Sequence, residues 1–290
     1  MPPGMSSPDT PPRPAWQPFT FGSVAAFARA TGGRTLAVAV AFAILDALLV
    51  FGAFELGWLP VLDAAVEALP ESGEIRAQEL HWNREDATVL AGSRLLQLVV
   101  DGNATGAFGH EADLRLELRR SDFRLCGAFG CWTRPYPAGW IVALNRPELV
   151  PLWGAWRPFV LWGVFLGTAV ALLASWIGLA TAGAIPLRLA AFYADREVTL
   201  MGCWRLLVAA LLPGGLLLGT AVFFYGLRGL STIELLAYFL LHFVIGAVYA
   251  SGALRRLPEV VVTATVPPIN PFRAAPEVAN NPIPPAKPGA

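Results

Sequence analysis

Four apolar runs, each long enough to cross a lipid bilayer as a helix, constrain this chain more than any other feature. A transmembrane helix needs about 20 mostly apolar residues. The runs cover residues 35–56, 158–182, 205–227 and 232–254. The hydrocarbon core of a bilayer contains no water that could bond to backbone N–H and C=O groups. Such runs therefore form helices, in which these groups bond to one another. The sequence therefore predicts an α-helical polytopic membrane protein with four transmembrane helices.

The composition supports this class and excludes others. Hydrophobic residues make up 55% of the chain and charged residues only 14%, whereas soluble proteins carry about 25% charged residues. The formal net charge is +0, so no electrostatic attraction favours a nucleic acid. We expect the lipid bilayer as a partner and no nucleic acid.

The first apolar run is interpreted as an uncleaved helix rather than a signal peptide. A long polar segment precedes it, Asp46 and Glu55 lie within it, and no small-residue cleavage site follows. Signal peptides have a short basic start and a shorter apolar region. The run should therefore remain in the mature protein as transmembrane helix 1.

The distribution of arginine predicts the orientation. Arginines flank the apolar runs in residues 1–34, a Pro-rich tail with a short amphipathic segment, in the loop or amphipathic helix of residues 183–204, and at the start of the Pro-rich, disordered tail of residues 255–290. The positive-inside rule places such segments in the cytoplasm. The arginines of the long segment 57–157 count for little, because long domains translocate regardless of charge. We therefore expect a cell (inner) membrane protein with both termini cytoplasmic and residues 57–157 outside.

Residues 57–157 are predicted to form a small β-rich or α+β extracytoplasmic domain between helices 1 and 2. Leucines alternate with charged residues over residues 112–119, which is typical of a half-buried strand with leucine on the covered face. Residues 95–101 end at Gly102-Asn103 and indicate a second strand followed by a turn.

Two cysteines lie close together in this outer domain. Cys126 and Cys131 flank a Gly-Ala-Phe-Gly sequence that is typical of a hairpin tip. An extracytoplasmic position permits a disulfide. Two free thiols, or a redox or metal pair, remain the alternatives.

Two ionisable residues lie near the middle of predicted membrane helices, Asp46 in the first and His242 in the fourth. Charged groups are costly at that depth, so each is a candidate functional residue. An Asp46–His242 pair could relay protons. The alternative is a structural hydrogen bond that holds two helices together.

Small residues recur at intervals of four in two of the predicted helices. Such stripes let a second helix approach closely, either within the chain or between protomers. The predicted helix-packing residues are Gly163, Gly167, Ala171, Ser175, Gly215 and Gly219.

The sequence contains no recognisable catalytic, metal-binding or cofactor-binding motif. The leading hypothesis is a non-enzymatic accessory, scaffold or sensing protein of the cell envelope, without a cofactor, that acts through its outer domain on a protein partner or by self-association. The alternative is a small oligomeric transporter or channel that uses Asp46 and His242.

The order of the parts resembles the DUF1189 family of bacterial membrane proteins, which is related to the Yip-domain proteins. The residues that carry the likeness are Tyr193, Trp204-Arg205-Leu206, Pro213 and Tyr249. The resemblance implies an integral membrane protein with an accessory or envelope function, and it supplies no catalytic residues.

Overall fold

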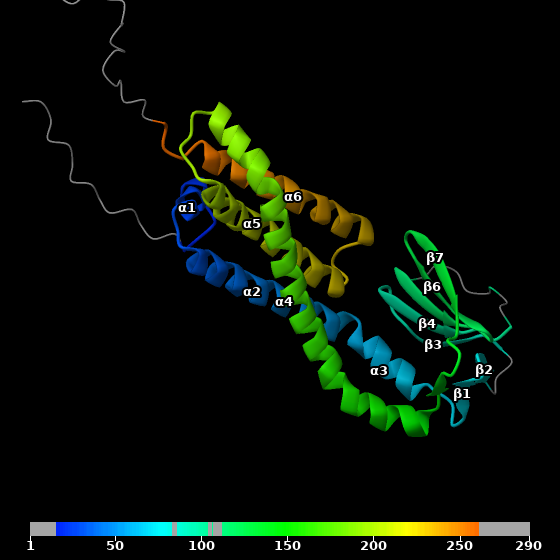
Figure 1. The fold of residues 1–290 in the computed structure, drawn as a ribbon. Helices are drawn as coiled ribbons and strands as arrows, with labels where there is room; N and C mark the ends of the chain where they lie inside the picture. Colours follow the sequence, from blue (N-terminus) through cyan, green and yellow to red (C-terminus); the bar gives the residue numbers. More distant parts are fainter. Residues whose placement is uncertain (1–15, 83–85, 104–105, 107–111, 261–290) are drawn as a thin grey trace, which may run out of the picture.

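The computed structural model describes residues 16–82, 86–103, 106 and 112–260. A bundle of long helices and a group of β-strands lie next to each other, with the strands beyond one end of the bundle (Figure 1). We call this the sheet end. The opposite end, where α2 begins and α6 finishes, is called the tail end.

Three helices precede the strands: α1 (Phe21–Phe27), α2 (Gly32–Gly57) and α3 (Leu59–Glu67). Thr20 and Ser23 form a capping box that starts α1, and the Thr31 hydroxyl accepts from a backbone N–H to start α2. Such caps satisfy N–H groups that the first helical turn leaves unpaired. Pro60 stands in the first turn of α3, where it costs no hydrogen bond.

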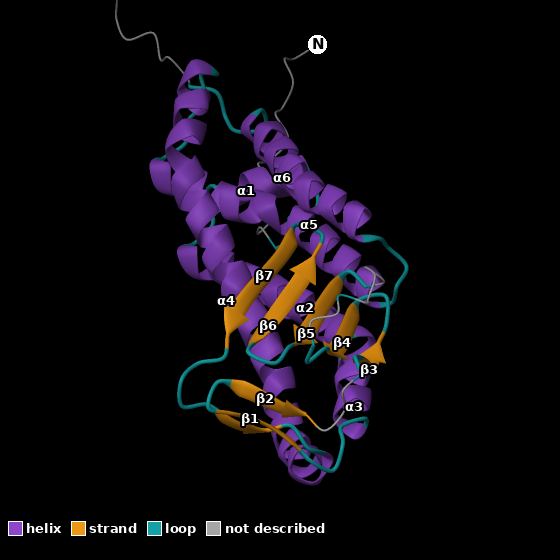
Figure 2. Ribbon diagram, turned by 90° about the vertical axis from the view of Figure 1, so that its right-hand side faces the viewer, coloured by secondary structure: helices purple, strands orange, loops and turns teal. Residues whose placement is uncertain are grey.

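Eight strands form two sheets (Figure 2): β1 (Gly73–Arg76), β2 (Glu79–Trp82), β3 (Thr88–Gly92), β4 (Leu96–Val100), β5 (Leu114–Leu118), β6 (Asp122–Gly127), β7 (Gly130–Pro135) and β8 (Ile141–Ala143). The smaller sheet has the order β2-β1-β8 and the larger has the order β3-β4-β5-β6-β7. All pairs are antiparallel except β4 and β5.

The covered face of β5 differs from the prediction. Its three leucines are only half-buried, whereas Arg115 and Glu117 between them are 6% and 3% exposed. Alternation identifies two faces of a strand but does not identify the one that becomes covered. Here the polar face is the more deeply buried one, and the expectation of a leucine-covered face is wrong.

Three helices follow the strands: α4 (Arg146–Tyr193), α5 (Leu200–Gly226) and α6 (Thr232–Leu254). The 48 residues of α4 give it a length of about 72 Å, far more than the roughly 30 Å of a bilayer core. It crosses the other helices obliquely, as Figure 1 shows. Asn145 caps its start through the N–H of Glu148.

The helical core forms around α5, which packs against α2, α4 and α6. Many buried side chains of the bundle belong to α5, including Leu206, Val208 and Leu212. Trp176 of α4 and Phe27 of α1 complete this core. A second, smaller core joins the two sheets through Ile75, Leu80, Val100 and Tyr136.

Four helical stretches among the described residues are long and apolar enough to cross a membrane, judged by length and composition. They are Gly32–Glu67, Arg146–Tyr193, Leu200–Gly226 and Thr232–Leu254. The length and apolar composition of these helices support a membrane protein; they do not define its orientation.

The predicted fold class is wrong in the order and number of its elements. The prediction was a four-helix protein with its β-rich or α+β domain between helices 1 and 2. The described residues instead form six helices, and the two sheets follow α3 and precede the long helices α4, α5 and α6. The short helices α1 and α3 lie outside the four predicted apolar runs, and each depends on local caps and packing rather than on a long apolar run.

Candidate functional site

The larger sheet is fastened to the sheet end of the bundle by polar contacts. The guanidinium of Arg94 donates to the backbone oxygens of Leu230 (2.7 Å) and Arg228 (3.4 Å) in the α5–α6 loop. The Tyr225 hydroxyl of α5 donates to Asp113, just before β5, at 3.1 Å. The ends of β4 and β5 that face the bundle are therefore tied to α5 and to the loop after it.

Close backbone packing reinforces this junction. A Cβ on Gly57 would lie 2.5 Å from the backbone oxygen of Gly226 and 2.8 Å from a methyl carbon of Leu95. Leu95 itself is fully buried. Only glycine at position 57 lets α2, α5 and the sheet meet this closely, so the sheet has a defined position on the bundle.

The larger sheet has two edge strands, of which β3 packs against α3 and β7 is the more open. No strand pairs with the outer side of β7 in the part of the chain that the structure describes, and each of its six residues is exposed. The pairing of Gly127 with Gly130 leaves a two-residue turn, which makes these residues a hydrogen-bonded pair. Alternation then directs the backbone N–H groups of Cys131 and Thr133 away from β6.

A disulfide holds the β6–β7 hairpin closed. Cys126 and Cys131 are direct partners in the ladder, and their sulfur atoms are 2.05 Å apart. The bond therefore lies one pair away from the turn. Of the alternatives that the sequence left open, the structure contains the bonded pair.

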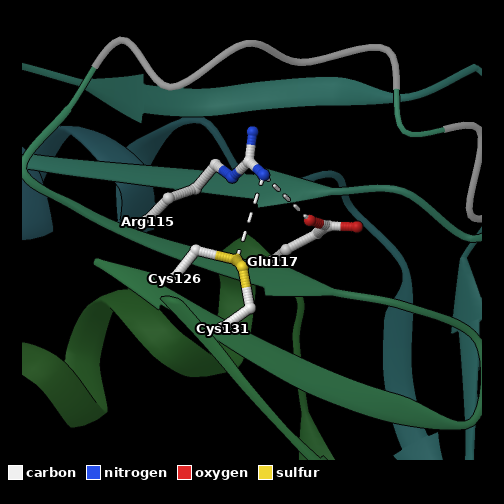
Figure 3. The surroundings of a disulfide bond; sticks show 4 residues. All are labelled: Arg115, Glu117, Cys126 and Cys131. Atoms are coloured by element: carbon white, nitrogen blue, oxygen red, sulfur yellow. Dashed lines mark hydrogen bonds and ion pairs between the residues drawn. A yellow bond between two sulfur atoms is a disulfide. The ribbon is translucent and has the colours of Figure 1, made fainter. Parts of the chain in front are cut away.

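A buried ion pair lies against this disulfide (Figure 3). Nη2 of Arg115 is 3.7 Å from Oε2 of Glu117 and donates weakly to the Cys126 sulfur at 4.0 Å. Breaking a buried pair by removing one partner leaves an uncompensated charge, which is strongly destabilising. Arg115 and Glu117 thus fix the sheet beneath the hairpin, and no sequence motif marked them.

Tyr136, next to the end of β7, anchors the strand. Its side chain is 1% exposed and its hydroxyl donates to the backbone oxygen of Arg119 at 2.8 Å. Burial, and then the negative charge of Asp122, raises the pKa of Tyr136 well above its ordinary range, against the lowering effect of Arg119. The phenol therefore stays neutral and keeps donating this bond.

Counting reactive thiols tests the disulfide and the compartment together. The chain has three cysteines, of which the structure leaves Cys203 free and buried. Alkylation of the denatured chain, taken from cells without reductant, should modify one thiol, and reduction should raise this to three. Three reactive thiols before reduction would contradict an oxidising environment for β6 and β7.

Asp46 is buried in the bundle without a hydrogen-bond partner among the described residues. It is 1% exposed, and neither carboxylate oxygen has a donor. The carboxylate lies against α5, where a Cβ on Gly219 would be 2.5 Å from Oδ1. An unpaired polar group in such a place costs about 1–3 kcal/mol.

His242 does not meet Asp46. Its Nδ1 is bonded to the backbone oxygen of Phe239 within α6, and its own backbone oxygen faces Gly214 of α5. Gly214 and Gly219 are five residues apart, which places them on different faces of a helix. The predicted pair is therefore not brought together, either as a relay or as a bond between helices.

Glycines of α5 let its three neighbouring helices approach closely. Gly219 faces Asp46 of α2, and Gly214 faces His242 of α6. A Cβ on Gly215 would lie 2.6 Å from the indole of Trp176 in α4. Gly215 and Gly219 were singled out by their spacing, whereas Gly214 was missed because it breaks that spacing.

The predicted stripe on α4 has a different position. Gly163, Gly167, Ala171 and Ser175 are all exposed, and a Cβ on Gly163 or Gly167 would meet nothing within 4 Å. The stripe therefore faces away from the described part of this chain and takes no part in packing within it.

A cavity of about 710 Å³ opens at the tail end. Its charged lining residues are Arg29, Arg188, Arg196, Asp195 and Glu197. Positive and negative side chains are mixed, so the cavity does not favour an ion of one sign. No group of three or more metal-ligating side chains occurs among the described residues.

No known protein family, curated protein or solved structure matches the chain. The resemblance to the DUF1189 family therefore stays a prediction.

Proposed function

We propose that this chain is a membrane protein of the cell envelope that acts by binding, as an accessory, scaffold or sensing protein, and that a partner protein pairs with the β7 edge. In this proposal the bundle lies in the inner membrane, both termini are cytoplasmic and the sheets are extracytoplasmic. The arginine distribution and the four apolar helices support that arrangement.

The observation that carries the proposal is the open edge of β7. An unpaired edge strand offers backbone donors and acceptors to an extended segment of another protein, while side-chain pockets supply specificity. At β7 these groups belong to Cys131 and Thr133, and all the side chains of the strand are exposed. The disulfide keeps the strand extended, which lowers the entropic cost of pairing.

The fixed position of the sheet adds support. Arg94 and Tyr225 connect the sheet to the α5–α6 loop. A partner on β7 would therefore be held at a defined place relative to the helices, as a scaffold or sensor requires.

In-cell photo-crosslinking tests the proposal. A photoreactive phenylalanine replaces Arg134, which lies on β7, or Trp140, which is exposed just before β8 in the smaller sheet. We expect an adduct with a second protein from position 134 and none from position 140. Equal adducts from both positions, or adducts from neither, would contradict binding at this edge.

A small transporter is the second candidate, and the unpartnered carboxylate of Asp46 is the observation that favours it. Intramembrane carboxylates often serve ion or proton pathways. The double variant Asp46→Asn with His242→Ala distinguishes the two functions. A transporter should lose transport after reconstitution while remaining folded, whereas a binding protein should keep its crosslink from position 134.

A further inference from the structure

We infer that the tip of the β6–β7 hairpin, Ala128-Phe129, inserts into the outer surface of the same bilayer that holds the bundle, with phospholipid as its binding partner. The inference rests on the proposed membrane location. It adds a lipid contact to a domain whose proposed role is protein binding at the neighbouring edge.

The exposure of Phe129 is the first observation. Its side chain is 94% exposed, the largest value among the exposed large hydrophobic side chains that the structure describes. The turn between Gly127 and Gly130 carries no charged side chain. A single exposed apolar side chain is common on a protein surface, so its meaning here depends on where the tip lies; at a membrane surface such a side chain can enter the headgroup–acyl boundary.

The direction of the hairpin is the second observation. Gly127 is paired with Leu114, and Asp113, the residue before Leu114, accepts from Tyr225 at the sheet end of α5. The turn therefore leaves the sheet at the same end that contacts the bundle. Figures 1 and 2 both show β6 and β7 meeting beside the ends of α5 and α6.

Those helix ends mark the expected edge of the hydrocarbon core. α5 finishes at Gly226 and α6 starts at Thr232, and both apolar stretches extend to these residues. A hairpin that points toward this level beside α6 brings its turn to the lipid headgroups. The disulfide prevents the hairpin from opening or bending away.

The side chains of the hairpin change from apolar to amphipathic with distance from its tip, as expected at a membrane surface. Moving from the tip, Phe129 is followed by Trp132 after about 10 Å and by Arg134 after about 17 Å. Trp132 is 51% exposed, and the guanidinium of Arg134 lies 5.0 Å from its ring centre. The apolar tip and the amphipathic ring behind it then match the acyl-chain and headgroup levels, and Arg134 lies further out, on the part of β7 that is left to a protein partner.

Fluorine NMR of the full chain in lipid nanodiscs tests the insertion. Trifluoromethylphenylalanine replaces Phe129, Ser121 or Val170 in three separate proteins. Ser121 lies in the turn at the opposite end of the sheet, and Val170 is an exposed residue of α4. Each signal is recorded with a nitroxide on the upper acyl chain and, separately, with a water-soluble gadolinium chelate.

We expect the position 129 signal to be lost with the nitroxide lipid and kept with the chelate, and the position 121 signal to show the reverse. If position 129 behaves like position 121 while position 170 is protected from the chelate, the insertion is wrong and the membrane location stands. If position 170 is also lost to the chelate, the membrane location itself is wrong.

Discussion

Gly214→Ala should lower the midpoint of thermal unfolding of the full chain in detergent or nanodiscs by about 5–10 °C. A Cβ at this position would collide with the backbone oxygen of His242. Backbone atoms cannot rotate away as a side chain can, so α5 and α6 must separate. Overpacking of this kind costs about 1–3 kcal/mol and sometimes more.

Gly163→Ala is the matched control for this substitution. It places the same methyl group on an apolar helix where nothing lies within 4 Å. Alanine favours a helix over glycine by about 1 kcal/mol, so the stability should stay unchanged or rise. Equal losses from Gly163→Ala and Gly214→Ala would mean that α4 packs on a second copy of the chain and that the α5–α6 contact is not special.

Asp46→Ala should raise the free energy of unfolding by about 1–2 kcal/mol. The substitution removes two buried oxygens that have no hydrogen-bond partner among the residues that the structure describes. The space left behind is small, because only part of a short side chain is lost. The measurement is thermal or denaturant unfolding of the full chain in nanodiscs.

Asp63→Ala should change stability in the opposite direction. The Asp63 carboxylate accepts from the indole of Trp153 at 2.7 Å and lies 3.4 Å from Arg157, which links α3 to α4. Its loss should cost about 1 kcal/mol at this partly exposed site. A destabilising Asp46→Ala, similar to Asp63→Ala, would show that Asp46 has a partner that the single chain does not supply.

Apolar length was the strongest signal in the sequence because it follows directly from the thickness of a bilayer. All four apolar runs lie within long helices. The helix α4 extends beyond the predicted span of residues 158–182 at both ends, and it includes Trp153 and Arg157, which look like interface residues in the sequence. Both side chains contact Asp63 of α3, which is far away in the sequence, so no local pattern could show this contact.

Local patterns located strands but not their partners. The strands over residues 95–101 and 112–119 correspond to β4 and β5, yet the buried face of β5 was assigned incorrectly. That face is decided by Arg115, Glu117 and the disulfide, which meet only after β5 and β6 pair.

The spacing of glycines indicated which helix faces could pack closely, but it did not indicate which neighbour packs on each face. Gly163 and Gly215 belong to equally regular stripes, but only Gly215 contacts another helix of this chain. Likewise, similar depth in the membrane suggested an Asp46–His242 pair. In the structure Asp46 of α2 and His242 of α6 contact different faces of α5 and do not meet. Helix rotation and neighbour order are tertiary properties, and spacing within one helix does not contain them.

The most direct test of the central claim is whether the crosslink from position 134 depends on the outward N–H of Thr133. Thr133→Pro removes this donor, and because it points away from β6, an edge strand tolerates the change. Thr133→Val keeps the donor and serves as the control. We predict that the proline variant loses the partner adduct in cells while the valine variant retains it, with the Cys126–Cys131 disulfide intact in both. An undiminished adduct in Thr133→Pro would contradict pairing of a partner strand with β7.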